Sequence, residues 1–119
     1  MKQDNLILDK SKAFAVRIVK LYQYLCDEKK EYVLSKQVLR SGTSIGANAK
    51  EAVRGQSKAD FIAKLNIALK EASETEYWLE LLYETAFLDK SQFDSIYTDN
   101  QELLKILTSI IKSANERRT

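Results

Sequence analysis

The stretch Arg40-Ser-Gly-Thr-Ser-Ile-Gly-Ala-Asn-Ala-Lys-Glu-Ala52 decides the fold class of this chain. At about 100° per residue of α-helix, its side chains and those flanking it separate into an apolar face and a charged face. The apolar face predicts a stripe that packs into a core, formed by Val38, Ile45, Ala49, Ala52 and Val53. The opposite, solvated face carries Lys36, Thr43, Lys50 and Arg54. The pattern therefore predicts an amphipathic helix.

A third line of side chains runs between these two faces. Arg40, Ser44, Asn48 and Glu51 are spaced by four, four and three residues, so a helix places them in one row. An ordinary surface helix needs only an apolar and a solvated face. This hydrogen-bonding row on the flank of the core indicates a place where another helix or another subunit packs.

Two glycines interrupt the same helix. Gly42 and Gly46 form a Gly-x-x-x-Gly pattern, and each glycine costs about 1 kcal/mol relative to alanine inside a helix. That cost predicts a backbone that a neighbouring element approaches closely. A phosphate-binding loop is excluded, because no strand precedes the stretch and no Gly-Lys-Ser/Thr follows.

Composition points to one helical domain covering residues 1–119. The chain has no proline and only three glycines, which long helices tolerate and turn-rich β folds do not. Cys26 is the only cysteine, so we expect a reduced, cytoplasmic protein without disulfides. We expect no membrane association, because neither a signal peptide nor an apolar run of about 18 residues is present.

Periodicity and capping signals predict four helices, over residues 9–29, 35–54, 58–86 and 91–113, after a loose lead-in at 1–8. Asp9 and Ser35 are the expected N-caps of the first two helices, and Gly55 is the expected stop of the second. Ser57-x-x-Asp60 and Ser91-x-x-Asp94 resemble capping boxes that open the third and fourth. Helices of this length with short connections predict an all-α, up-down-up-down antiparallel four-helix bundle.

The apolar arcs are wider than a single bundle requires, which predicts a homo-oligomer. Helix 9–29 carries two adjacent stripes, Phe14-Ile18-Leu21-Leu25 and Ala15-Val19-Tyr22-Cys26. The third and fourth helices are widened by Trp78, Leu81, Leu104 and Ile111. Residues 33–54 are net basic and residues 57–86 net acidic. This asymmetry suits attraction inside one bundle, or a head-to-tail contact between subunits.

Two carboxylates of the third helix, Glu71 and Glu74, fall within its apolar arc. A buried carboxylate needs a partner, and Arg40 is the obvious one. Removing one partner of a buried pair would cost about 3–5 kcal/mol. Glu51, Glu71 and Glu74 could also converge on a metal, but the chain has no histidine. The Glu-x-x-His ligands of metal sites in such bundles are therefore impossible, and we expect neither metal nor cofactor.

The motifs together resemble a known family. They are Arg40-Ser-Gly-Thr-Ser-Ile-Gly-Ala-Asn with Glu51-Ala52, then Phe61-Ile-x-Lys-Leu-x-Ile-Ala-Leu-Lys-Glu71-Ala-x-Glu74-Thr-x-Tyr-Trp-Leu. In these the chain is similar to the small four-helix-bundle proteins encoded in intervening sequences of bacterial 23S ribosomal RNA genes. These are related to the accessory variability protein of diversity-generating retroelements.

The resemblance implies a four-helix bundle that assembles into a pentameric ring and has no enzymatic activity. In the retroelement branch the bundle binds reverse transcriptase and nucleic acid, and that branch is strongly basic. The net charge of this chain is only +2, which favours the ribosomal RNA intervening-sequence branch. The positions that match the family motifs form the polar motif stripe: Arg40, Ser44, Asn48, Glu51, Glu71 and Glu74.

We therefore expect a non-enzymatic oligomeric bundle that serves as a binding or scaffold module for RNA or a protein partner. Lys36, Lys50 and Arg54, repeated around a ring, are the expected phosphate contacts. One alternative is a purely structural or protein–protein interaction bundle that does not bind nucleic acid. The other is an enzyme that uses Arg40, Glu71 and Glu74. The enzyme is less favoured, because without histidine the usual general base is missing.

Overall fold

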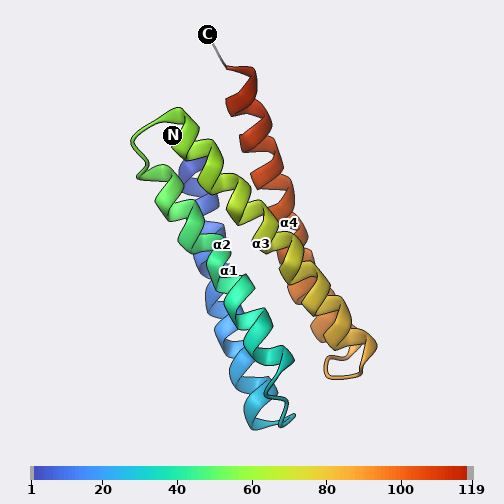
Figure 1. Ribbon diagram of the computed structural model, residues 1–119. Coiled ribbons are helices and arrows are strands. Elements are labelled where there is room, and N and C mark those ends of the chain that lie inside the picture. Colours follow the sequence, from blue (N-terminus) through green and yellow to red (C-terminus); the bar gives the residue numbers. More distant parts are fainter. Residues whose placement is uncertain (1, 118–119) are drawn as a thin grey trace.

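Four antiparallel helices make up the computed structural model, which describes the backbone of residues 2–117 and the side chains of residues 5–117. They are α1 (Lys2–Asp27), α2 (Leu34–Val53), α3 (Lys58–Glu84) and α4 (Lys90–Glu116). Successive helices run in opposite directions, and each packs against the next, with α4 also contacting α1 (Figure 1). Residues 2–117 contain no β-strand. The predicted all-α bundle is confirmed, as a rod of 52 × 21 × 19 Å.

The core follows the predicted three- and four-residue spacing along every helix. Each helix contributes side chains that are almost completely shielded from solvent, such as Ile18, Ile45, Leu79 and Leu107. Burying a leucine or isoleucine side chain contributes about 1.5–3 kcal/mol. The apolar faces thus hold together helices whose connections are only a few residues long. Within the described residues, no helix is long and apolar enough to span a bilayer.

The first helix begins earlier than the sequence analysis predicts. It starts at Lys2 rather than Asp9, so residues 2–8 are helical, while residue 1 lies outside the described residues. The reason is that the buried face of α1 continues toward the N-terminus before Phe14. Ser11 lies one turn earlier on the same face, and Ile7, one turn before that, is 1% exposed. Asp9 is an exposed mid-helix residue and not a cap.

The start of α2 is capped by a residue other than Ser35. The carboxylate of Glu31 accepts hydrogen bonds from the backbone N–H groups of Ser35 (2.7 Å), Leu34 (2.9 Å) and Val33 (3.1 Å). Burial acts to raise the pKa of Glu31, but these backbone donors outweigh it and lower the pKa below its usual value. Ser35 lies buried in the first turn, with its Oγ 3.8 Å from the Sγ of Cys26.

Of the two predicted capping boxes, one marks the right position and the other is misplaced. Ser57 caps α3, and its Oγ accepts a hydrogen bond from the Asp60 N–H at 3.0 Å. The cap of α4 is Asp89, two residues before the predicted Ser91. Asp89 accepts from the Gln92 N–H (2.8 Å), while Gln92 Oε1 accepts from the Asp89 N–H (2.9 Å). The helix also extends to Glu116, beyond the predicted end at residue 113.

Gly55 follows the end of α2 as predicted, but for a different reason. No glycine among the described residues has a positive φ, so the left-handed stop that favours glycine is not used here. Instead, a Cβ at Gly55 would lie 2.5 Å from Asp60 Oδ2 and 3.1 Å from the Ala52 carbonyl oxygen. A side chain at this position would require the Asp60 side chain to move and the backbone of the connection to shift slightly.

Candidate functional site: a polar cluster and a basic groove

Arg40 on α2 joins two carboxylates of α3. Its Nη1 donates to Glu71 Oε1 at 3.2 Å, and its Nη2 donates to Glu74 Oε2. The same Glu74 oxygen accepts a hydrogen bond from the indole Nε1 of Trp78 at 2.9 Å. The predicted pairing of Arg40 is thus confirmed with both glutamates. We call Arg40, Glu71, Glu74 and Trp78 the ionic cluster.

The ionic cluster is not buried, contrary to the expectation from the apolar arc of α3. The Arg40 side chain is 50% exposed, and those of Glu71 and Glu74 are 21% and 35% exposed. The carboxylates lie on the margin of the α2–α3 contact rather than inside it. Half-exposed ion pairs are screened by water and contribute about 1 kcal/mol or less. Loss of Arg40 should therefore cost far less than the 3–5 kcal/mol of a buried pair.

The rest of the polar motif stripe divides between bonds within α2 and a second ion pair. Ser44 Oγ donates to the Arg40 carbonyl at 2.7 Å, and Asn48 Nδ2 donates to the Ser44 carbonyl at 2.9 Å. Glu51 pairs with Lys64 of α3 at 3.1 Å and does not join Glu71 and Glu74. Among the described residues, no group of three or more acidic or cysteine side chains is arranged to hold a metal ion.

Beneath the ionic cluster lies a buried hydroxyl pair that the sequence analysis did not predict. Thr75 Oγ1 lies 2.8 Å from Ser41 Oγ and donates to the Glu71 carbonyl at 2.8 Å. Both hydroxyl residues are 0% exposed. In the sequence, Thr75 falls at a position of α3 where the three- and four-residue spacing would otherwise place an apolar side chain. A threonine there is compatible with the core only if its hydroxyl is satisfied.

The two glycines of α2 lie against α1, which confirms the close approach predicted from their spacing. A Cβ at Gly42 would lie 2.7–2.9 Å from three carbons of the Ile18 side chain. A Cβ at Gly46 would lie 3.2 Å from Ser11 Oγ and 3.3 Å from the Ser11 carbonyl oxygen. Arg40 and Glu51 of the polar motif stripe thus contact α3, whereas the two glycines contact α1.

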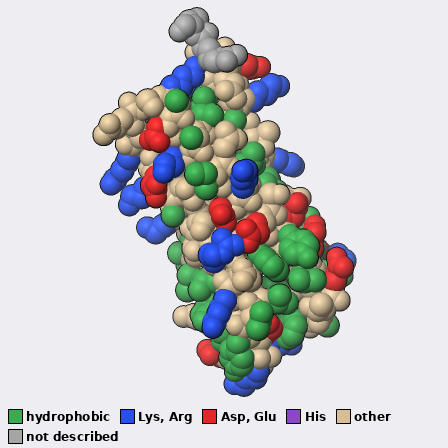
Figure 2. Space-filling view, viewed as in Figure 1, with side chains coloured by type: hydrophobic (Ala, Val, Ile, Leu, Met, Phe, Trp, Pro, Cys, Tyr) green, Lys and Arg blue, Asp and Glu red, His purple; other side chains and the backbone are tan. Residues whose placement is uncertain are grey.

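Two of the three predicted phosphate contacts lie together. Lys50 and Arg54 are exposed and one turn apart at the end of α2. Lys36 is exposed in the first turn of the same helix, about 21 Å away at 1.5 Å per residue. The space-filling view shows basic side chains gathered along the left edge of its upper half (Figure 2). The structure therefore does not place Lys36 with the other two.

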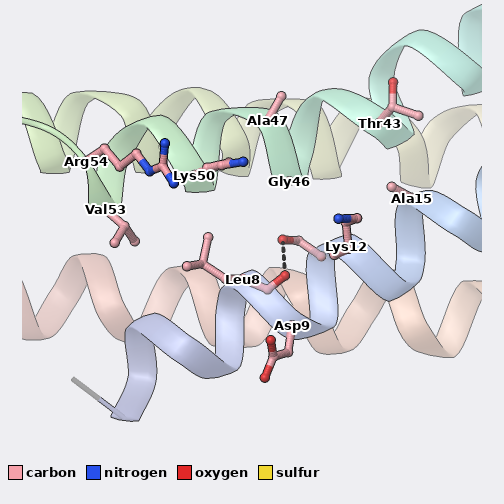
Figure 3. A pocket seen from close by; sticks show the side chains of 11 residues that line it. Leu8, Asp9, Lys12, Ala15, Thr43, Gly46, Ala47, Lys50, Val53 and Arg54 are labelled. Carbon is pink, nitrogen blue, oxygen red and sulfur yellow. Dashed lines mark hydrogen bonds between the residues drawn. The ribbon is translucent and has the colours of Figure 1, made fainter.

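A groove between α1 and α2 adds a third cation to Lys50 and Arg54. It has a volume of about 420 Å³, and Lys12 of α1 lines it opposite the two α2 residues (Figure 3). Lys12 was missed in the sequence analysis. It could have been found from the four- and three-residue spacing of Leu8, Lys12 and Ala15, which places all three on the side of α1 that faces α2. We call Lys12, Lys50 and Arg54 the basic cluster.

The basic cluster has no carboxylate partner within residues 5–117. No ion pair joins Lys12, Lys50 or Arg54 to a carboxylate in that range. Figure 3 shows the Asp9 side chain pointing away from α2. Three exposed cations that converge on one groove create a positive local potential, which attracts an anion such as phosphate.

The opposite side of the bundle carries a different polar contact, between α3 and α4. The Tyr97 hydroxyl donates to Glu80 Oε2 at 2.8 Å and lies 3.3 Å from Glu76 Oε2. Burial and these two carboxylates raise the pKa of Tyr97 well above its usual value. Its ring stacks on Phe93, which in turn stacks on Tyr83, with centroids 4.6 Å apart in each pair. These residues tie α4 to α3.

The fold and the site define a small antiparallel four-helix-bundle protein with an ionic cluster on one seam and a basic groove on another. The family model of the 23S rRNA-intervening sequence proteins matches residues 3–109, and the chain belongs to this family. The ribosomal RNA intervening-sequence resemblance is thereby confirmed.

A solved structure supports the same assignment. The chain is 63% identical to a protein of unknown function from the S23 ribosomal protein family of Bacteroides thetaiotaomicron, known from a crystal structure. The match covers 92% of this chain and 98% of that one, with a TM-score of 0.91. A search of curated proteins found no match.

Proposed function

We propose that this protein is a non-enzymatic, cytoplasmic, ring-forming bundle that binds RNA through the phosphate backbone. Lys50 and Arg54 make the central contacts, and assembly repeats them around the ring. Family membership supports a connection with ribosomal RNA genes, because the family is that of the 23S rRNA-intervening sequence proteins. The number of subunits, five, follows from the family resemblance.

The observation that carries this proposal is the basic cluster. Its three cations are exposed, converge from two helices and pair with no carboxylate in residues 5–117. A single subunit offers few phosphate contacts, and each contact adds only a modest, salt-dependent increment. A ring multiplies the number of contacts without requiring a high net charge, and this reconciles RNA binding with a net charge of +2.

Exposed apolar side chains support assembly. Val16 and Val19 on α1 are 47% and 40% exposed, and Val33 before α2 is 71% exposed. Part of the wide apolar arcs predicted for α3 and α4 is buried within the subunit, because Trp78 and Leu104 pack against its own core. The exposed valines, and the apolar side chains gathered in the lower half of Figure 2, remain available for a neighbouring subunit.

Charge reversal tests the proposed RNA contact. The variant with Lys50→Glu and Arg54→Glu should bind a labelled RNA at least about tenfold more weakly than the wild type at low salt. Lys36→Glu, compared with Lys50→Glu alone, is the matched control, because each reverses one exposed lysine on the same helix and Lys36 lies far from the basic cluster. Equal loss in both variants would show only a general charge effect, and no loss in the double variant would refute the proposed contact.

A second candidate is a protein-interaction bundle without RNA binding. It is favoured by an exposed aromatic side chain at the ionic cluster: Tyr77, which is 57% exposed, packs edge-on against Trp78 with centroids 5.1 Å apart. Tyrosine, tryptophan and arginine are enriched at the energetic centres of protein interfaces. This candidate predicts no RNA binding by the assembled protein even at low salt.

A further inference from the structure

The wall of the groove between α1 and α2 combines charged and apolar side chains. The cations of the basic cluster occupy one part of its wall, while Leu8 and Val53 supply aliphatic surface. Figure 3 shows Leu8 and Val53 pointing toward one another from the two helices. A purely electrostatic contact with a nucleic-acid backbone requires no apolar surface. The combination indicates a ligand that has both an anionic group and an apolar surface.

Small residues line part of the groove. Gly46 lets α1 and α2 approach closely at Ser11, and beside this contact the lining residues Ala15 and Ala47 end at Cβ. The volume of about 420 Å³ lies within the range of about 300–1,000 Å³ typical of small-ligand pockets. The groove is thus large enough for more than a phosphate group.

A neighbouring hollow shows what distinguishes this groove. On the other side of Lys50 and Arg54, a hollow of about 650 Å³ is lined by Glu51 and Asp60 as well as by Lys64. Its carboxylates repel phosphate, and Lys64 is already paired with Glu51. Among the residues with described side chains that line the α1–α2 groove, Asp9 is the only acid, and its side chain points away from α2. An anion is therefore favoured in the α1–α2 groove.

We propose that the α1–α2 groove takes one unpaired nucleotide of bound RNA, with its phosphate on Lys12, Lys50 and Arg54 and its base against Leu8 and Val53. This inference rests on the proposed RNA binding and specifies its substrate class, single-stranded RNA. A duplex presents phosphates to the exposed Lys50 and Arg54, but its bases are paired and stacked and do not enter the groove. Single strands should therefore bind more tightly than duplexes of equal length.

The test compares a labelled oligouridylate with a blunt RNA duplex of the same length, by fluorescence anisotropy at one salt concentration. Leu8→Asn removes the apolar surface proposed to hold the base without changing the charge, and should weaken single-strand binding about tenfold while leaving duplex binding unchanged. Leu6→Asn is the matched control, because it makes the same change at a leucine of α1 that is 42% exposed and is not among the residues that line the groove. Circular dichroism confirms that both variants remain helical.

A second measurement uses the wild-type protein, so that it does not depend on the variant folding. Photo-crosslinking with an oligouridylate that contains thiouridine should label the peptides that carry Leu8 to Ala15 or Gly46 to Arg54. Equal affinity for single strands and duplexes, or crosslinks confined to other helices, would overturn the inference and leave the proposed backbone contact intact. No binding of either RNA would overturn the proposed function together with the inference.

Discussion

At the scale of single residues, the glycines of α2 predicted a close neighbour, whereas its charged residues predicted a pairing partner but not how deeply the pair is buried. The Gly42 and Gly46 spacing correctly predicted a close neighbour, because a helix tolerates such a cost only where the backbone is approached. The partner of Arg40 was also predictable, from the opposite charges of Glu71 and Glu74. The exposure of that pair was not predictable, because the helical wheel places both carboxylates near the apolar arc but does not say how far the neighbouring helix covers them.

Replacing Gly42 with alanine should destabilise the bundle, although alanine is the better helix former. The substitution recovers about 1 kcal/mol of helix propensity. It also places a Cβ 2.7–2.9 Å from the Ile18 side chain, and overpacking a core typically costs about 1–3 kcal/mol. We expect a net fall of about 1 kcal/mol in the free energy of unfolding, measured by urea denaturation.

A double-mutant cycle isolates the cause. In an Ile18→Ala background the space beside residue 42 is empty, so Gly42→Ala should be neutral or stabilising there. A Gly42→Ala protein more stable than the wild type would mean that α1 moves away at no cost. The proposed reason for this glycine would then be wrong.

At the scale of elements, the sequence predicted the number of helices, their order and their approximate lengths, because the three- and four-residue apolar spacing is long and regular. The starts of the helices were harder to predict. A cap depends on which nearby oxygen reaches the first free N–H groups, and Glu31 and Asp89 compete successfully with Ser35 and Ser91. The groove was also missed, because it needs Lys12 of α1 beside residues nearly forty positions later in the chain.

The cap of α2 should make stability depend on pH. The pKa of Glu31 is lower in the folded protein than its usual value of 4.5. The stabilisation is therefore fully present above about pH 4.5 and is lost as the pH falls through the folded-state pKa. Glu31→Gln should lower the free energy of unfolding by about 1 kcal/mol at neutral pH, and the difference from the wild type should disappear in acid.

Urea denaturation over a series of pH values measures this effect. Glu28→Gln serves as the control, since Glu28 is an exposed acid in the same connection. If the curves of wild type and Glu31→Gln stayed parallel down to low pH, the carboxylate would not be the source of the cap's stability.

At the scale of the whole molecule, the proposed RNA binding depends on the assembly of several subunits. Exposed Val16, Val19 and Val33 leave apolar surface on a bundle whose core is otherwise complete. A basic α2 and an acidic α3 on one subunit suit a head-to-tail contact, and such contacts close into rings when the rotation allows. One chain by itself does not determine the number of subunits, since this depends on the angle between neighbours.

Size-exclusion chromatography with light scattering, in moderate salt, measures the assembly directly. We expect one species of about five times the subunit mass of 13.7 kDa. A stable dimer would retain oligomerisation but eliminate the ring. A single species near 13.7 kDa at micromolar concentration would eliminate assembly altogether.

The most direct test of the central claim, RNA binding through repeated phosphate contacts, is the salt dependence of binding by the assembled wild-type protein. For a single strand, the logarithm of the association constant should fall linearly with the logarithm of salt concentration, with a slope of about −0.7 per neutralised phosphate. The three cations of one subunit's basic cluster would give at most about −2.1, so we expect a slope steeper than this, because several subunits of the ring engage the RNA. An affinity that does not change with salt, or no binding at low salt, would contradict it.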